Sequence, residues 1–449
     1  MPEPGARDAA LSVLAGWREK GGGKFEALLH ASFTKFGLDA RERRLATELA
    51  YGTLRNLINL DYVLSHFIKE TKKGVSPAVR DILRLAAYQI NYLTRIPARA
   101  AVDEAVKQAK RVEGAGAGGF VNAVLRSLLR EPGRVSYPDP AREPVKNLSL
   151  TLSFPEWLAS RWLARFGFDE ARALMEASNA APPLTLRANT LRAGRAGLMK
   201  LLEDGGYDCA PAAYAPDGII IRGAANVPEL PGYADGLFAV QDEAAQLVSL
   251  LVAPKPGERI LDACAAPGGK SMHMAALSGG RARITAADIG LDKLRLLQEN
   301  ITRLRIENIR VVRADAAMPP PLPEQKFDAV LLDAPCSALG VIRRRPEIKY
   351  ARREEDIARM AELQARMLEN LAGCVRPGGR LVYCVCSTEP EEAVAVDRLL
   401  SSKDWELEDP RPFLPDAAHP LVTGEGYMRT YPHRHGTDGF FAARLARTR

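Results

Sequence analysis

The segment RILDACAAPGGKS, residues 259–271, decides how the second half of this chain folds. Its apolar run leads into a proline and two glycines, and the following residues can start a helix, so we expect a strand that turns sharply into a helix. Further strand candidates are RITAAD (283–288), IRVVRAD (309–315), FDAVLLD (327–333) and RLVYCVC (380–386). Amphipathic stretches such as 292–305 lie between them. This alternation predicts a doubly wound parallel sheet over residues 237–449.

The remaining sequence predicts two further domains. Residues 1–133 carry apolar side chains at helical spacing throughout, which indicates a helix bundle. The segment EPGRVSYPDPAREP, residues 131–144, is rich in proline and charge and reads as a linker. Residues 145–236 mix helical patterns with short strands, so we expect a small α+β module there.

Charge is unevenly distributed along the chain. The net charge is +7, and residues 1–133 hold 21 Lys and Arg against 14 Asp and Glu, so the rest is balanced. A basic helical domain is typical of nucleic-acid binding, although a solubilising surface explains the same excess. We find no apolar run of membrane length and no secretory signal, and we expect a cytoplasmic protein. The six cysteines lack paired spacing, so we expect reduced thiols and no metal site.

The turn at Pro267, Gly268 and Gly269 is a candidate cofactor site. Glycines allow backbone N–H groups to approach a ligand closely. Asp288 ends the next predicted strand, where a carboxylate can accept hydrogen bonds from both ribose hydroxyls, and Asp315 ends the third, within reach of an adenine edge. The chain lacks GxGxxG and a complete Walker A loop, so S-adenosylmethionine fits better than a dinucleotide or a nucleoside triphosphate. An ordinary β-α turn with capping acids is the alternative.

Two cysteines, Cys336 and Cys386, follow predicted strands beside this turn. A lone cysteine is usually a buried apolar residue, which suits Cys209, Cys264 and Cys374. A thiolate at the sheet edge can instead add to carbon 6 of a pyrimidine and activate carbon 5 for methylation. A carboxyl group near ring nitrogen 3 would assist, and Asp333 suits that role. A second thiol could then help to release the product.

The segment VIRRRPEIKYARR, residues 341–353, is the strongest basic run near these thiols. We expect Arg343, Arg344, Arg345 and Lys349 to bind phosphates of a nucleic-acid strand whose target base enters the pocket. A solvated helix start is the alternative interpretation.

Four segments resemble the signatures of RNA 5-methylcytosine methyltransferases of the NOL/NOP2/Sun superfamily: residues 262–271, 331–350, 383–392 and 432–445. Residues 1–133 are similar to the NusB-type RNA-binding helical domain, and this fusion is the layout of the bacterial RsmB (Sun, Fmu) branch. The resemblance implies an all-α NusB-like domain, a small α+β (RRM-like) module and an α/β Rossmann-like class I methyltransferase domain.

The resemblance also implies an activity and a set of site residues. The activity is S-adenosylmethionine-dependent methylation of one cytosine in small-subunit (16S) rRNA. Independently of the resemblance, we expect a cytoplasmic monomer with no DNA and no membrane as partner. Cys386 is the implied nucleophile, and Cys336 assists release. The residues implied to surround cofactor and base are Cys264, Ala265, Ala266, Pro267, Gly268, Gly269, Lys270, Asp288, Asp315 and Asp333. Val385 and Ala393 depart from the family's usual Thr and Asn without removing a reacting group.

Two other functions compete with this interpretation. A dehydrogenase would leave both cysteines unexplained, and a non-catalytic RNA-binding factor would leave the cofactor and thiol motifs unexplained. Cys384 is an extra thiol on the same strand face as Cys386, and we expect His433 and His435 to be structural.

Overall fold

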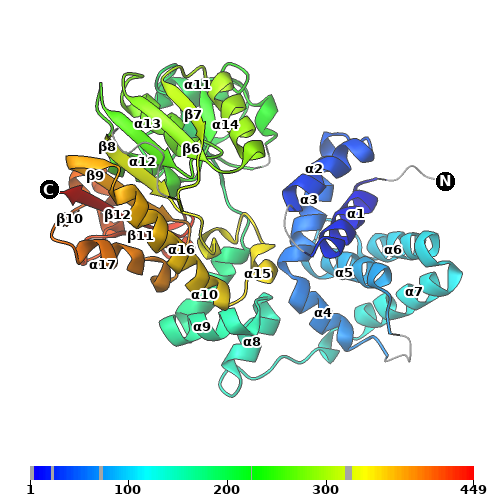
Figure 1. Cartoon of the computed structure of the whole chain (residues 1–449). Helices are drawn as coiled ribbons and strands as arrows, with labels where there is room; N and C mark the ends of the chain where they lie inside the picture. The colour runs from blue at the N-terminus through cyan, green and yellow to red at the C-terminus, as the bar shows by residue number, and fades with distance from the viewer. Residues whose placement is uncertain (1–4, 22–24, 70–73, 224, 319–325) are drawn as a thin grey trace. The chain divides into compact units, whose positions relative to one another are not determined.

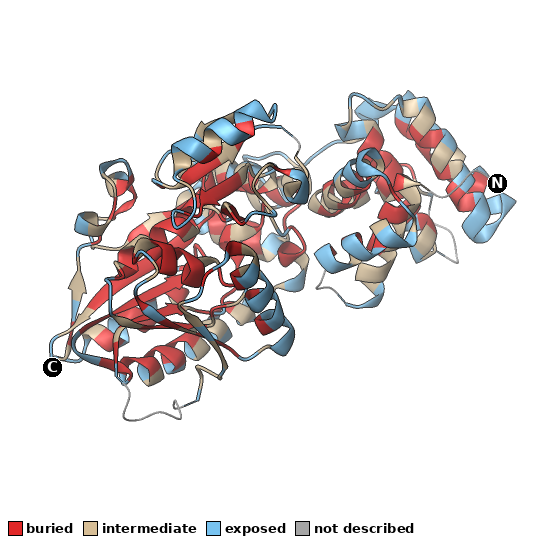
Figure 2. Cartoon of the chain, turned by 90° about the horizontal axis from the view of Figure 1, so that it is seen from above, coloured by how far each residue is buried: buried red, intermediate tan, exposed pale blue. Residues whose placement is uncertain are grey.

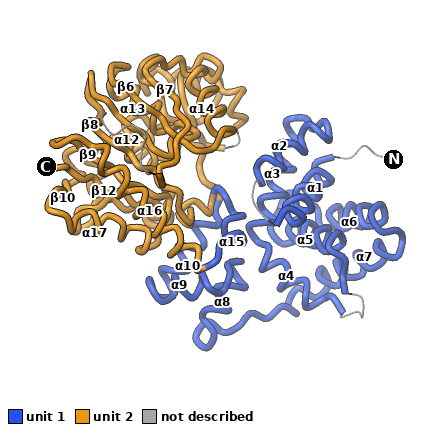
Figure 3. Tube along the Cα trace, viewed as in Figure 1, with its two compact units in different colours: residues 1–180, 344–353 blue, residues 181–343, 354–449 orange. Residues whose placement is uncertain are grey.

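The structure is a computed structural model that describes residues 5–21, 25–69, 74–223, 225–318 and 326–449. The chain divides into two compact units, shown in Figure 3. Unit 1 contains residues 1–180 and 344–353, and unit 2 contains residues 181–343 and 354–449. Figure 1 labels the elements of each unit along the chain.

Unit 1 is built from helices throughout its described residues. They are α1 (Ala6–Glu19), α2 (Phe25–Lys35), α3 (Ala40–Arg55), α4 (Leu57–Ser65), α5 (Pro77–Tyr92), α6 (Ala98–Glu113), α7 (Ala115–Arg130), the 3₁₀ turn η1 (Pro132–Arg134), α8 (Pro144–Leu152), α9 (Glu156–Phe166), α10 (Phe168–Asn179) and α15 (Ile348–Ala351). Side-chain caps start two of the longer helices: Asp39 accepts the Glu42 N–H at 2.8 Å, and Ser76 accepts the Val79 N–H at 3.2 Å. One apolar core runs through α1–α7, with α5 contributing fully buried Ile82 and Leu83.

Helices α3 and α5 approach each other closely in this core. A Cβ atom at Gly52 would lie 2.0 Å from the Tyr88 ring, a separation that atoms cannot adopt. The absent side chain therefore allows the tyrosine ring to lie against the α3 backbone, where its hydroxyl donates a hydrogen bond to Glu48 Oε1 at 2.5 Å.

Unit 2 contains two sheets. The smaller has the antiparallel order β2-β3-β1-β4, made of β1 (Leu184–Ala188), β2 (Cys209–Pro211), β3 (Gly218–Ile221) and β4 (Phe238–Val240), with α11 (Arg195–Asp204) and the turn η2 (Val227–Glu229). The larger has the order β10-β12-β9-β8-β5-β6-β7, and β11 also pairs with β12.

The strands of the larger sheet are β5 (Arg259–Ala263), β6 (Arg283–Asp288), β7 (Ile309–Arg313), β8 (Phe327–Asp333), β9 (Val375–Val385), β10 (Trp405–Glu408), β11 (Met428–Thr430) and β12 (Phe440–Arg447). Its helices are α12 (Glu243–Val252), α13 (Gly269–Leu277), α14 (Leu291–Leu304), α16 (Glu355–Ala372), α17 (Val394–Leu400) and α18 (Pro432–His435). Its 3₁₀ turns are η3 (Leu339–Val341), η4 (Pro390–Glu392), η5 (Arg411–Phe413) and η6 (Asp416–Leu421).

Both faces of the larger sheet are covered. Ala329 and Leu331 of β8 pack in one cluster with α12, α13 and α14, while Val330 and Leu332, which point to the opposite face, are also fully buried. Figure 2 shows these strands buried between flanking helices. Strands β5–β9 are mutually parallel, as the sequence predicts, whereas β10, β11 and β12 add an antiparallel edge that it does not.

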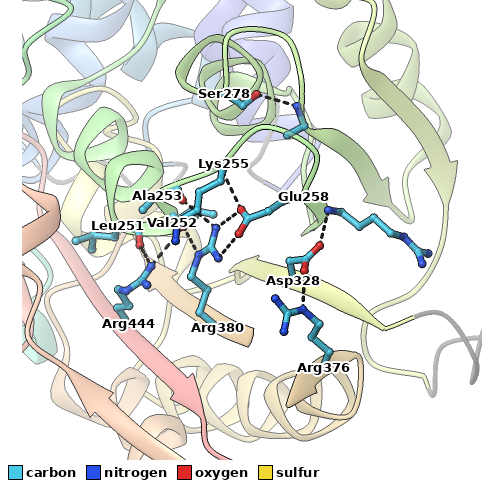
Figure 4. Close-up of polar contacts among 12 residues, drawn as sticks. Leu251, Val252, Ala253, Lys255, Glu258, Ser278, Asp328, Arg376, Arg380 and Arg444 are labelled. Atoms are coloured by element: carbon cyan, nitrogen blue, oxygen red, sulfur yellow. Dashed lines mark hydrogen bonds and ion pairs between the residues drawn. The ribbon is translucent and has the colours of Figure 1, made fainter. Parts of the chain in front are cut away.

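Buried arginines anchor α12 at the end of the sheet opposite the strand carboxyl ends. Figure 4 shows Arg444 of β12 and Arg380 of β9 reaching the last carbonyls of this helix. Arg444 donates to Leu251 O at 2.6 Å, and Arg380 donates to Ala253 O at 2.9 Å while Glu258 neutralises its charge. Both arginines satisfy helix C-terminal carbonyls that have no partner within the helix.

The predicted module 145–236 is divided between the two units. Helices α8–α10 belong to unit 1, where Ser153 Oγ accepts the Ile58 N–H at 2.8 Å and the Asn59 side chain donates to Leu150 O at 2.8 Å. Strands β1–β4 belong to unit 2, where Asn189 donates to Leu304 O at 3.0 Å. Polar contacts with the preceding and following domains thus join the two halves of this module to different units.

Candidate active site

Four parallel strands bring the predicted site residues to one sheet edge. Strand β5 ends at Ala263, β6 ends at Asp288, β8 ends at Asp333 and β9 ends at Val385. Since parallel neighbours end at the same edge, the glycine turn, the acidic residues and both thiols meet there.

The turn after β5 is held by backbone hydrogen bonds. Ala265 N–H donates to Ala287 O of β6 at 2.8 Å, and Gly268 N–H donates back to Ala265 O at 2.8 Å. Gly268 has a φ of 99°, and a Cβ there would lie 2.2 Å from Leu297 Cδ1, so glycine is required. Helix α13 begins at the next residue, Gly269.

Side chains from α14 and β1 donate hydrogen bonds to the backbone carbonyls of this turn. Asn300 of α14 donates to Pro267 O at 3.2 Å. Arg187 of β1, which is fully buried, donates to Gly269 O at 2.5 Å and to the Gln241 side chain. The small sheet thus supplies a residue that fixes the start of α13.

The two acids predicted for the cofactor lie beside this turn. Asp288 accepts the Gly290 N–H at 3.0 Å and the Ala266 N–H at 3.3 Å. Asp315 accepts the Ala317 N–H at 2.9 Å and lines an apolar pocket together with Cys264. Burial raises the pKa of the Cys264 thiol to about 12, with nearby Asp333 adding to the shift, so this cysteine stays a protonated wall residue.

Lys270, which is buried, forms an ion pair with the half-buried Asp333 at the centre of the edge. The Lys270 ammonium lies 2.6 Å from Asp333 Oδ2. Burial by itself lowers the pKa of Lys270, but the charges of Asp333 and its neighbours more than offset that effect and the pKa is raised. The Cys384 sulfur lies 3.3 Å from Asp333 Oδ1.

Cys336 and Cys386 come together although they follow different strands. Their sulfur atoms are 3.3 Å apart. Cys336 is buried, and both its contact with Cys386 and its burial raise the pKa of its thiol. Cys386 is only half-buried. Cys384, in contrast, is fully buried, and its burial, together with the charge of Asp333, raises the pKa of its thiol. Of the two neighbouring cysteines Cys384 and Cys386, therefore, Cys386 is the one that a substrate can reach.

The structure gives two of the four predicted phosphate-binding residues a different role. Arg343 is buried in unit 2, with Nε 2.6 Å from Asp438 and Nη2 3.1 Å from Asp242. Lys349 is fully buried in unit 1, where burial lowers its pKa and its ammonium donates to Arg55 O at 2.7 Å. Because these cations are already surrounded by protein acceptors, the prediction that they bind phosphate is corrected to a structural role.

Arg344 and Arg345 remain at or near the surface. Arg344 is half-buried, and Arg345 is exposed with its Nε 3.1 Å from Glu347. His435 accepts the Tyr431 N–H at Nδ1 at 2.9 Å, which fits the expected structural role of that histidine.

Asp262 is a site residue that sequence reasoning missed. It lies fully buried in β5 and accepts a hydrogen bond from Ser271, so it ties the strand to the first turn of α13. Burial raises the pKa of its carboxyl to about 7. A signal was present, because Asp262 is a carboxylate that directly follows the apolar pair Ile260 and Leu261 of the predicted strand. Glu392 was also missed, although it is fully buried and accepts the Ser337 N–H at 2.8 Å, next to Cys336.

The described residues contain no group of three or more His, Cys, Asp or Glu side chains placed to hold a metal ion. Among the same residues, no helix has the length and apolar character needed to cross a membrane.

Family models match three parts of the chain. The 16S rRNA methyltransferase RsmB/F model matches residues 249–446, the NusB family model matches residues 4–130, and the ferredoxin-like domain model of RsmF/B-like methyltransferases matches residues 154–228. These matches confirm the expected sequence of a NusB-like, a small α+β and a methyltransferase domain.

Similarity to individual proteins extends over the whole chain. The probable ribosomal RNA small subunit methyltransferase B of Bacillus subtilis (strain 168) is 37% identical, covering 98% of each chain. The ribosomal RNA small subunit methyltransferase B of Pseudomonas putida (strain KT2440) is 36% identical, covering 91% of each. The crystal structure of a protein called PH0851 superposes with a TM-score of 0.81 at 27% identity, covering 99% of each chain. The chain therefore belongs to the 16S rRNA methyltransferase RsmB/F family, as a relative of the small subunit methyltransferases B.

Proposed function

We propose that this chain transfers a methyl group from S-adenosylmethionine to carbon 5 of a cytosine in small-subunit rRNA, through a covalent bond between Cys386 and carbon 6. The observation that carries the proposal is the 3.3 Å separation of the Cys336 and Cys386 sulfurs beside the cofactor turn. One thiol can add to the ring while the other stands next to the bond that must later break.

The residues around the turn fit S-adenosylmethionine. Asp288 and Asp315 offer carboxylate oxygens to ribose hydroxyls and an adenine amino group, and the pocket beside Asp315 is lined mainly by apolar side chains. Lys270 is the basic residue of the turn, and it is paired with Asp333 rather than presented to a phosphate. When bound, S-adenosylmethionine supplies an electrophilic methyl group.

Three residues of the protein act on the cytosine ring: Cys386, Asp333 and Cys336. The Cys386 thiolate forms a bond to carbon 6, which moves electron density to carbon 5 and towards ring nitrogen 3. In its protonated form the Asp333 carboxyl group donates its proton towards nitrogen 3, which neutralises that charge, and Lys270, 2.6 Å from Asp333 Oδ2, stabilises the carboxylate that remains. After carbon 5 accepts the methyl group, a water molecule takes its proton, the electron pair of that C–H bond restores the double bond between carbons 5 and 6, and the Cys386 sulfur leaves carbon 6 as a thiolate. Cys336 assists this release, because its S–H group can donate a hydrogen bond to the departing thiolate 3.3 Å away.

Substitution of each thiol tests the mechanism. With labelled S-adenosylmethionine and a small-subunit rRNA transcript, the wild type should form 5-methylcytidine, and Cys386→Ser should give neither product nor adduct. Cys336→Ser should methylate but remain covalently joined to RNA on a denaturing gel. Cys384→Ser is the matched control, expected to retain both steps because its thiol is buried.

Three results would contradict the proposal. If Cys384→Ser alone abolished the adduct, the nucleophile would be the wrong cysteine. If the Cys386 and Cys336 variants both stayed active and free of adduct, the covalent route would be excluded. RNA binding by the wild type without any methyl transfer would favour a non-catalytic factor.

A further inference from the structure

Glu392 is a fully buried carboxylate at the end of η4, with donors on both of its oxygen atoms. Oε1 accepts the Ser337 backbone N–H at 2.8 Å and the Gln364 side-chain amide at 2.9 Å. Oε2 accepts the Ser337 hydroxyl at 2.5 Å and also the Ser387 hydroxyl. One side chain thus connects the loop after β8, the loop after β9 and helix α16.

The two serines are the immediate neighbours of the two reactive thiols. Ser337 follows Cys336 and Ser387 follows Cys386, and the serine hydroxyl oxygens are 3.0 Å apart. The sheet fixes where β8 and β9 end, but the thiols lie beyond those ends. Glu392 joins the two loops directly, at the residue following each thiol.

A second layer holds Glu392 itself in place. The Gln364 amide that contacts Oε1 also donates to Pro335 O at 2.9 Å, one residue before Cys336. The Tyr383 hydroxyl lies 2.6 Å from the Glu392 carbonyl oxygen and 3.0 Å from Gln364 Oε1. Both neighbours are fully buried, so the carboxylate has a fixed position from which to hold the loops.

We propose that Glu392 is a positioning residue that sets the distance between the nucleophilic and the releasing thiol. The inference rests on the proposed function. Glu392 has no part in bond making, because its oxygens are occupied by protein donors. Its effect comes through geometry, since a displacement of about 1 Å in a reacting group can cost on the order of 100-fold in rate.

Glu392→Gln tests the proposal while keeping the shape of the side chain. In the variant an NH2 group replaces one of the two carboxylate oxygens. This group is a donor and would face the donors that the oxygen accepts from in the wild type, so those hydrogen bonds must break. We expect kcat for methylation of the rRNA transcript to fall about 100-fold. The KM for RNA and the Kd for S-adenosylmethionine should stay within about threefold, because Glu392 is fully buried and its oxygens accept hydrogen bonds from protein groups.

Glu243→Gln is the matched control. Glu243 is another buried glutamate whose carboxylate accepts backbone N–H groups, from Tyr214 at 2.7 Å and Ala215 at 3.1 Å, and it contacts neither thiol loop. It should lower the melting temperature without a selective loss in kcat. A Glu392→Gln variant that lost only stability, like this control, would overturn the proposal.

Ser387→Ala is a second test that can be used if the Glu392 variant does not fold. It removes one hydroxyl, and we expect kcat to fall about tenfold with KM unchanged. The double variant Ser387→Ala/Glu392→Gln should be little worse than Glu392→Gln alone, since both changes disrupt the one hydrogen-bond network that holds the two thiol loops together. Fully additive losses, or an unchanged kcat in the serine variant, would contradict the proposal. A wild type that transfers no methyl group would instead overturn the proposed function, and this inference with it.

Discussion

At the residue scale, burial separates side chains that look equivalent in the sequence. Cys384 and Cys386 are two residues apart in the sequence, yet Cys384 lies inside β9 and contacts Asp333, whereas Cys386 follows the end of that strand and is half-buried. The sequence predicts the shared face from strand periodicity, but it does not show which thiol the strand end exposes. That difference comes from the position at which β9 stops, at Val385.

Removal of the Asp288 carboxylate should weaken cofactor binding. We expect Asp288→Ala to reduce the affinity for S-adenosylmethionine by on the order of 2 kcal/mol, the contribution of a hydrogen-bonded carboxylate. Isothermal titration calorimetry measures it. Asp292→Ala, in which the lost carboxylate is almost fully exposed at the start of α14, is the control. Equal affinity of both variants would remove Asp288 from the cofactor site.

Asp262 should make stability depend on pH. Its folded pKa of about 7 exceeds the ordinary 3.8, so between these values the folded state holds a proton that the unfolded state has released. Its contribution to stability therefore falls as pH rises through that window. Asp262→Asn cannot titrate. In urea unfolding, the stability of the wild type relative to this variant should fall by on the order of 3 kcal/mol from about pH 5 to about pH 8. Parallel pH profiles would contradict the assignment.

At the element scale, helix packing in unit 1 depends on a missing side chain. Gly52→Ala should destabilise the protein by about 1 to 2 kcal/mol, because the clash with Tyr88 outweighs the better helix propensity of alanine. Gly119→Ala is the matched control. It lies in α7 with nothing within 4 Å of its Cβ position, so it should stabilise by about 0.5 to 1 kcal/mol. Calorimetric unfolding of both variants measures these effects, and a stabilised Gly52→Ala would contradict the close approach.

The elements also show which parts of the fold the sequence could predict. Strands β5–β9 are recognisable in the sequence because each contains an apolar run, and helices follow β5, β6 and β8. Strand β12 pairs with β9, which lies far away in the sequence, and nothing in its composition fixes that register.

Lys349 is the clearest failure at the site, because a lysine in a basic run predicts exposure and only the tertiary structure reveals the carbonyl groups around its ammonium.

At the scale of the whole molecule, the charge excess of residues 1–133 predicts how RNA affinity responds to salt. Arg41, Arg44 and Arg95 are exposed there. Their joint replacement by Gln should weaken binding to the rRNA transcript and reduce the slope of log affinity against log salt by about 0.7 to 0.9 per lost phosphate contact. Lys200→Gln, an exposed change in the balanced part of the chain, is the control. An unchanged slope in the triple variant would show that these arginines only solubilise the domain.

The assignment of residues 344–353 to unit 1 has a consequence for folding during synthesis. The ribosome makes residues 1–180 first, but Lys349, which donates to the carbonyls of Arg55 and Ser153, follows only after residues 181–343. At about 5–20 residues per second, that interval is on the order of 10 to 30 s. During that interval the nascent residues 1–180 lack the ammonium group that these two carbonyls bind in the finished protein. A gene fragment ending at codon 180 therefore does not encode the whole of unit 1, and exchanging it between relatives would separate the unit from residues 344–353.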